Sequence, residues 1–185
     1  MALSLDGMVE WHQHRSLVRD AEASLRGEIT RNAQGMDQAL ADLQKTRESL
    51  ARDVGILKTV IATGKLPADS KMEIASGIRV LENVSWKTAQ STGALSYMTY
   101  EQARKYASIY ATQDLLIDSE QQAARDAIIS VAPFLNTQDG DADPSPEQAD
   151  AIKQKIEVLQ GQLLLVGSLM QSLDSEYKAF LAAHR

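Results

Sequence analysis

Apolar side chains recur at alternating spacings of four and three residues in the first third of the chain. This spacing keeps one stripe on one side of a helix and requires a partner helix along its length. The pattern predicts a first helix from about Met8 to Thr63, with Gly64 as its C-terminal stop and Pro67 beyond it. Only Arg47 is not apolar in the stripe, which comprises Ile29, Ala33, Met36, Leu40, Leu43, Arg47, Leu50, Val54, Leu57 and Ile61.

The end of the chain carries a second stripe with the same alternation. Ser145 is its predicted cap, because Gln148 completes a capping box and Pro146 fits the first helical turn. Two such stripes predict an all-α fold: an antiparallel helical bundle with a very long first helix, a short helical pair and two further long helices. The second stripe comprises Ile152, Ile156, Leu159, Leu163, Val166, Met170, Leu173, Tyr177 and Phe180.

The middle of the chain predicts the short helical pair and one more long helix. Residues 68–83 and 85–93 form the predicted pair. Thr99 and Gln102 make a capping box that starts the long helix. Residues 137–146 contain acids, Gly and Pro and predict a flexible acidic loop. The predicted buried side of the long helix comprises Ala103, Tyr106, Tyr110, Gln113, Ile117, Ala124, Ile128 and Val131.

The rhythm of the first helix changes near its start. Residues at successive spacings of four are Leu17, Ala21, Leu25 and Ile29. Repeated fours carry a stripe around the helix, so this part faces a different partner, or none. We therefore expect one helical domain over residues 1–185, with residues 1–28 as a stalk-like extension and residues 29–185 as the bundle body.

Charge and composition narrow the classes of function. The net charge is −6, and Lys and Arg are scattered among acidic residues, so we expect no nucleic-acid partner. The chain has no cysteine, which excludes disulfides, thiol catalysis and thiolate metal sites. It has no apolar run of the ~18 residues needed to span a bilayer, and no signal peptide is visible.

Two patterns suggest a metal site, and both fall short of one. Glu10 and His14 share a helix face, but with His12 nearby they still offer too few ligands, which favours a solvated helix start. The DGDAD sequence at residues 139–143 opens like a calcium loop, but Pro144 replaces the required Gly and Asp150 the required Glu. We therefore expect neither a metal nor a cofactor.

Most of the aromatic residues are concentrated in one quarter of the chain. They can line a small-molecule pocket, or they can fill the wide part of a bundle where short helices cross a long one. The sequence has no Gly-rich phosphate loop, nucleophile elbow or HExxH motif, so we expect no enzyme activity. The candidate cluster, for ligand binding or for structure, comprises Trp86, Gln90, Tyr97, Tyr100, Tyr106, Tyr110 and Gln113.

Two stretches together resemble a known family. The first is ALSLDGMVEWHQHRSLVRDAEASLRGEITRN at residues 2–32, and the second is SWKTAQSTGALSYMTYEQARKYASIYATQ at residues 85–113. Both are similar to a family of uncharacterised bacterial proteins with one N-terminal transmembrane helix and a soluble all-helical domain. The most specific part of the resemblance is the pattern of Trp86, Gly93, Ala94, Leu95, Tyr106 and Tyr110.

The resemblance implies a setting and carries no activity with it. It implies a single-pass inner-membrane protein whose helical domain lies on the periplasmic side. Residues 1–5 would then be the end of a truncated anchor, and Trp11 and Arg15 would lie near the lipid headgroups, where such side chains are favoured. The alternative is a native protein that starts here and is soluble.

Three hypotheses for the function follow from these observations. The first is a non-enzymatic, membrane-tethered helical domain acting in extracytoplasmic sensing, binding or scaffolding. The second is a small-molecule sensor with a pocket near the Trp/Tyr cluster. The third is a cytoplasmic coiled-coil adaptor, which would bind a protein partner or self-associate through the first helix at residues 17–29.

Overall fold

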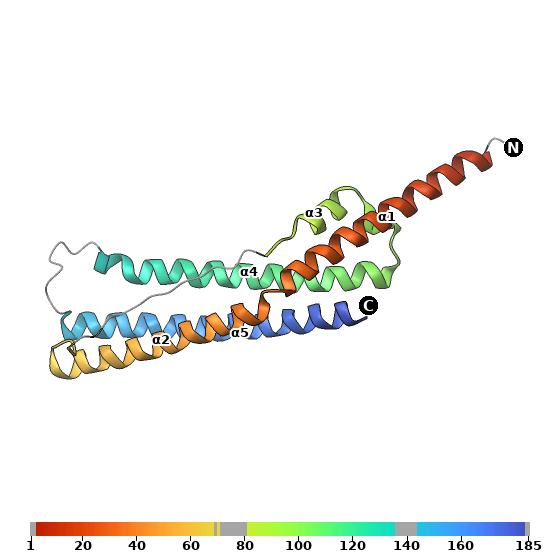
Figure 1. The fold of residues 1–185 in the computed structure, drawn as a ribbon. Helices are drawn as coiled ribbons and strands as arrows, with labels where there is room; N and C mark the ends of the chain where they lie inside the picture. Colours follow the sequence, from red (N-terminus) through yellow and green to blue (C-terminus); the bar gives the residue numbers. More distant parts are fainter. Residues whose placement is uncertain (1–2, 69, 71–80, 136–143, 184–185) are drawn as a thin grey trace. The chain divides into compact units, whose positions relative to one another are not determined.

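The computed structural model describes residues 3–68, 70, 81–135 and 144–183, and every regular element in those ranges is helical (Figure 1). The predicted all-α bundle is therefore confirmed. In order along the chain, the helices are α1 (Leu3–Ala33), α2 (Met36–Thr63), α3 (Val84–Ser91), the 3-10 helix η1 (Ala94–Tyr97), α4 (Tyr100–Leu135) and α5 (Pro146–Ala182).

The long first helical run extends from Leu3 to Thr63 with one interruption. Gln34 and Gly35 form a turn between α1 and α2. The Gln34 amide still donates to the Thr30 carbonyl at 3.1 Å, and glycine is a weak helix former, so the break falls where the helix is least stable. The run ends as predicted at Gly64, whose φ of 68° suits a residue without a side chain.

Both predicted capping boxes are present. The Gln102 amide donates to Thr99 Oγ1 at 3.3 Å, and the Thr99 amide donates to Gln102 Oε1 at 3.0 Å. At α5, the Gln148 amide donates to Ser145 Oγ at 3.2 Å, and the Ser145 amide donates to Gln148 Oε1 at 2.8 Å. Each box therefore satisfies backbone donors that a helix start leaves without partners.

Two of the predicted segments fall largely outside the described residues. The first of the short helical pair, at 68–83, lies mostly at 69 and 71–80, and the acidic loop lies mostly at 136–143. The described end of the first segment, Leu81–Asn83, has no regular structure and leads into α3, the second member of the pair.

The chain divides into two compact units. Unit 1 comprises residues 1–36, 80–115 and 172–185, and unit 2 comprises residues 37–79 and 116–171. The first boundary between the units lies after residue 36, and the residues predicted as a stalk, 1–28, belong to unit 1. The cause is visible at Leu25 and Glu28, which are 0% and 1% exposed because the rest of unit 1 packs on α1.

Unit 2 is built from α2 and the adjoining parts of α4 and α5. Within it, α2 and α4 run in one direction and α5 runs in the opposite one (Figure 1). Gly167 lets α5 approach α2 closely, since a Cβ there would lie 3.2 Å from Leu43 Cδ2. The core of unit 2 comprises Leu50, Val54, Leu57, Val60, Ala123, Ala127, Ala149, Ile152, Ile156 and Leu159.

The buried side of α4 differs from the prediction after Gln113. Leu116, Ala123 and Ala127 are buried, each one residue before the predicted member, and Ile128 is 66% exposed. At each of these places the sequence has two adjacent apolar residues, such as Leu116 and Ile117. A buried stripe could therefore continue from Gln113 with a spacing of either three or four residues. The side chains that face the core at the last two pairs are alanines, which allow helices to pack closely.

Candidate functional site

Polar side chains gather in the interior of unit 1, where buried polar groups require hydrogen-bond partners. They come from α1, α4 and α5. Glu28, Asn32, Gln113, Tyr110 and Tyr177 are each at most 3% exposed. We call these five residues, with Trp86, the buried polar cluster.

Glu28 joins three elements through its two carboxylate oxygens. The Tyr110 hydroxyl of α4 donates to Glu28 Oε1 at 2.6 Å, and the Ser85 amide at the start of α3 donates to Glu28 Oε2 at 2.7 Å. Hydrogen bonds to a carboxylate are shorter and stronger than neutral ones. One side chain of α1 therefore fixes the positions of α3 and α4 relative to it.

Asn32 and Gln113 hold the backbone of Glu82 from both sides. The Glu82 amide donates to Asn32 Oδ1 at 3.0 Å. Asn32 Nδ2 and Gln113 Nε2 each donate to the Glu82 carbonyl at 2.8 Å. Leu81–Asn83 is not helical, so these side chains supply the partners that a helix would otherwise provide.

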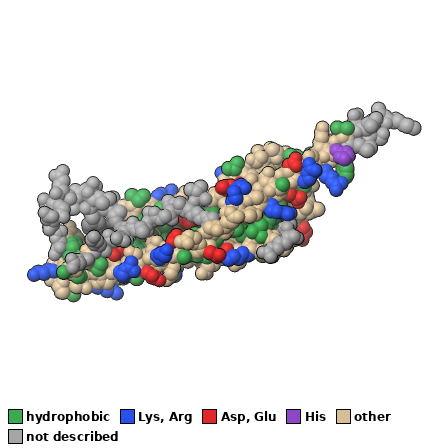
Figure 2. Space-filling view, viewed as in Figure 1, with side chains coloured by type: hydrophobic (Ala, Val, Ile, Leu, Met, Phe, Trp, Pro, Cys, Tyr) green, Lys and Arg blue, Asp and Glu red, His purple; other side chains and the backbone are tan. Residues whose placement is uncertain are grey.

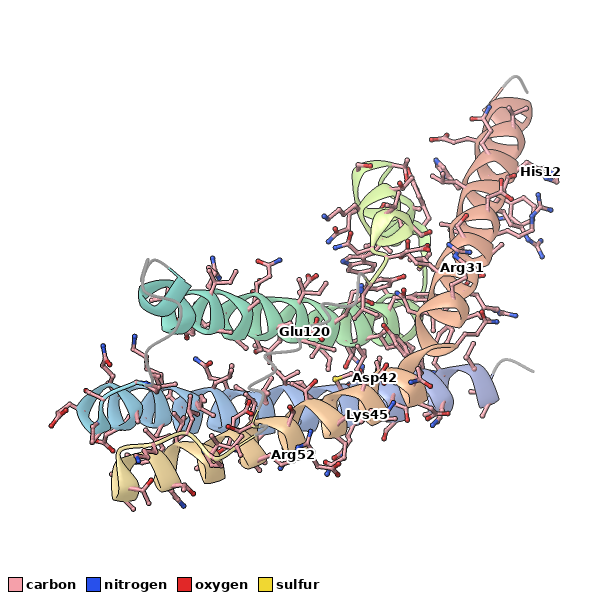
Figure 3. All side chains as sticks on the ribbon, turned by 60° about the vertical axis from the view of Figure 1, so that its left-hand side comes forward. His12, Arg31, Asp42, Lys45, Arg52 and Glu120 are labelled. Atoms are coloured by element: carbon pink, nitrogen blue, oxygen red, sulfur yellow. The ribbon has the colours of Figure 1, made fainter. Side chains whose placement is uncertain are left out.

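Gln113 also links α4 to α1 and α5. Its Oε1 accepts from the Tyr177 hydroxyl at 2.7 Å and from Asn32 Nδ2 at 3.2 Å. At the surface beside it, the Arg31 Nε and Nη2 atoms both donate to Glu82 Oε2, at 3.0 and 2.8 Å. Hydrogen bonding from Arg31 lowers the pKa of the Glu82 carboxyl group. Figure 3 shows Arg31 near the end of α1.

Two pairs of aromatic rings pack in unit 1, and the first pair joins α3 to α4. Trp86 stacks on Tyr110 with ring centroids 5.0 Å apart and an angle of 7° between the planes. Tyr106 packs against Phe180 of α5 with centroids 5.3 Å apart. Burial raises the pKa of Tyr106 to about 12. Burial also raises the pKa of Tyr110, and its hydrogen bond to Glu28 adds to the effect.

The structure brings together four of the seven cluster residues proposed from the sequence. Trp86, Tyr106, Tyr110 and Gln113 are buried. The other three are on the surface: Tyr97 is 49% exposed, Tyr100 is 81% exposed, and Gln90 is exposed as well. The described geometry thus favours packing as the role of the buried four, since Trp86 stacks on Tyr110, Tyr106 packs on Phe180 and Gln113 bonds to Tyr177.

Sequence reasoning missed Glu28, Asn32 and the segment at Glu82. Glu28 and Asn32 are four residues apart, and each directly precedes a member of the apolar stripe, Ile29 or Ala33. Polar residues at that spacing beside a buried stripe are a usable signal for a buried polar pair. The partner at Glu82 carried no comparable signal, because its backbone rather than its side chain makes the bonds.

A second group of aromatic and basic side chains lies on the surface of α1. His14 stacks on Tyr97 of η1 with ring centroids 3.8 Å apart. The Arg15 guanidinium carbon lies 5.1 Å from the centroid of the Trp11 ring, which is a cation–π geometry. Trp11 is 54% exposed, and Figure 2 shows a histidine beside Lys and Arg side chains on this surface.

The described residues contain no set of three His, Asp or Glu side chains placed to hold a metal ion. The DGDAD sequence lies outside these residues. Among the helices that the structure describes, none combines the length and apolar character needed to cross a membrane.

No protein-family model, curated protein or solved structure matches this chain. The resemblance to a bacterial membrane-protein family therefore remains a prediction.

Proposed function

We propose that this protein is a non-enzymatic helical domain that acts in binding or scaffolding outside the cytoplasmic membrane and is tethered to it at its N-terminal side. The observation that supports a non-enzymatic role is the buried polar cluster. Its carboxylate, amide and hydroxyl groups lie in the interior and bond to one another and to the backbone. A general acid or base must instead reach a substrate proton.

The exposed group on α1 supports the tether. Trp11, Arg15 and Tyr97 combine an apolar body with a polar or charged tip, and such side chains are favoured at the level of lipid headgroups. Unit 1 contains ten acidic and nine basic residues, whereas unit 2 contains fifteen and ten. Unit 1 is thus nearly neutral, and an anionic lipid surface would repel it less than unit 2.

The sensor hypothesis receives less support from the geometry. A pocket at the Trp/Tyr cluster would need space between rings that stack on each other, as Trp86 and Tyr110 do. Self-association through residues 17–29 would have to avoid Leu25 and Ile29, because the chain's own side chains cover both completely.

Cell fractionation of the complete gene product tests the tether and the side of the membrane. We expect the protein to stay in the membrane fraction after alkaline carbonate extraction. We also expect protease added to spheroplasts to digest it. Recovery in the soluble fraction would contradict the tether, and protection from protease in intact spheroplasts would place the domain in the cytoplasm, as the adaptor hypothesis requires.

A further inference from the structure

The ring and the hydroxyl of Tyr110 both have partners that suit a one-electron oxidation. The ring stacks on Trp86 with centroids 5.0 Å apart and an angle of 7° between the planes. The hydroxyl donates to Glu28 Oε1 at 2.6 Å. A tyrosine that loses an electron also gives up its hydroxyl proton, so a buried tyrosine needs a base within hydrogen-bond reach. The Glu28 carboxylate is such a base.

Tyr177 provides the contrast within the same cluster. Tyr110 and Tyr177 are both 0% exposed, but Tyr177 donates to the neutral Oε1 of Gln113 at 2.7 Å. An amide oxygen accepts a hydrogen bond, but it is too weak a base to take the proton away. Of these two buried tyrosines, Tyr110 alone therefore has an acceptor for its proton.

Trp86 is the member of the stack that reaches the surface. It is 9% exposed, whereas Tyr110 and Glu28 are 0% and 1% exposed. A one-electron oxidant in solution can therefore contact the Trp86 ring and not the Tyr110 ring. Because nearly parallel stacked rings overlap through their π systems, an electron can pass directly from one ring to the other.

We propose that Trp86, Tyr110 and Glu28 form a one-electron relay, which carries an oxidising equivalent from the surface into the interior of unit 1. A small inorganic radical takes one electron from the Trp86 ring, which becomes a radical cation. Tyr110 then gives one electron to Trp86 and its hydroxyl proton to Glu28 Oε1. The products are a neutral Trp86, a neutral tyrosyl radical and a neutral carboxyl group.

Burial favours these products. The transfer removes the positive charge on oxidised Trp86 and the negative charge on Glu28, and both charges are costly in an interior of low dielectric constant. The Ser85 amide donates to Glu28 Oε2 at 2.7 Å and so holds the carboxyl group in place while Oε1 takes the proton. The relay needs neither a tether nor a binding partner, so it stands independently of the proposed function.

Pulse radiolysis with the azide radical, which oxidises tryptophan, tests the relay. The background is Trp11→Phe, since Trp11 is 54% exposed and its replacement leaves Trp86 as the single tryptophan. We expect the absorption of the Trp86 radical to decay as that of a tyrosyl radical grows. Both changes should share one rate constant that does not depend on protein concentration. Tyr110→Phe should abolish this step, and Tyr177→Phe is the matched control that should retain it.

Glu28→Gln tests the proton acceptor. Glutamine keeps the size of the side chain but cannot take up the proton, and the loss of a positioned base should slow the transfer by about 100-fold. Circular dichroism verifies that each variant folds. Heavy water should also slow the transfer, and this measurement needs no substitution within the relay.

Three results would each overturn the proposal. One is the absence of a tyrosyl radical that forms at the rate at which the Trp86 radical decays. Another is a tyrosyl signal of this kind that Tyr110→Phe leaves unchanged. The third is a transfer as fast in heavy water as in ordinary water, which would show that no proton moves with the electron.

Discussion

Tyr110→Phe tests how much the buried polar cluster stabilises unit 1. The substitution removes a hydroxyl that donates to Glu28 Oε1 at 2.6 Å, and it keeps the ring that stacks on Trp86. Removing a buried bond to a charged acceptor costs about 1.5–3 kcal/mol. In a protein of this size, each kcal/mol lowers the melting temperature by about 2–4 °C. We therefore expect the melting temperature to fall by about 3–12 °C.

Tyr177→Phe is the matched control. Both tyrosines are fully buried, and both substitutions remove one hydroxyl. The acceptor of Tyr177, Gln113 Oε1, is a neutral amide oxygen that also accepts from Asn32, so its loss should cost only about 0.5–1.5 kcal/mol.

Urea unfolding followed by tryptophan fluorescence measures both free energies of unfolding, with an unchanged m value as the sign that only stability has changed. If Tyr110→Phe costs no more than Tyr177→Phe, the reasoning that makes Glu28 the centre of the cluster is wrong.

Three further outcomes are expected. Gly55→Ala should raise the free energy of unfolding by about 0.5–1 kcal/mol, because alanine has a higher helix propensity than glycine. Gly167→Ala should raise it less, because the Leu43 side chain must move to make room for the new methyl group. Urea unfolding measures both changes. Thr99→Ala should lower it by about 0.5–2 kcal/mol through loss of the cap, with Thr99→Ser as the conservative control. Stability should fall as pH rises through 10–12, because burial raises the pKa of Tyr106 to about 12 in the folded protein from its ordinary value of 10.0. Thermal melts at several pH values should show less of this fall in Tyr106→Phe.

Those elements with local signals could be predicted from the sequence. The capping boxes at Thr99 and Ser145 depend on residues three apart, and the α5 stripe on spacings within one helix. Both predictions are confirmed by the hydrogen bonds and burial of those residues. A capping box is specific because it satisfies two backbone donors with two particular side chains.

Features that depend on distant residues could not be predicted. Glu28 and Asn32 have the polarity of a solvated helix face, and they are buried because a segment about 50 residues later crosses them. On α4, adjacent apolar pairs such as Leu116 and Ile117 offer two faces of equal apolar character. Only the neighbouring helices decide which face is buried.

The unit boundary at residue 36 follows from the same cause. The stripe from Ile29 to Ile61 continues across the break at Gln34 and Gly35, so its periodicity alone gives no sign that two units share it. What separates them is the set of elements packed on each part: α3 and η1 contact α1, whereas the unit 2 core joins α2 to α4 and α5.

Hydrogen exchange at the Glu82 and Ser85 amides tests the central claim most directly, namely that the buried polar cluster is a closed structural joint. Both amides donate to side chains of α1, at 3.0 Å to Asn32 and at 2.7 Å to Glu28. We expect both to exchange at least about 100-fold more slowly than free amides, which corresponds to about 2.7 kcal/mol for opening. Asn32→Ala and Glu28→Ala should each release the amide that they hold. Exchange of both amides at the rate of an unstructured peptide would contradict the account.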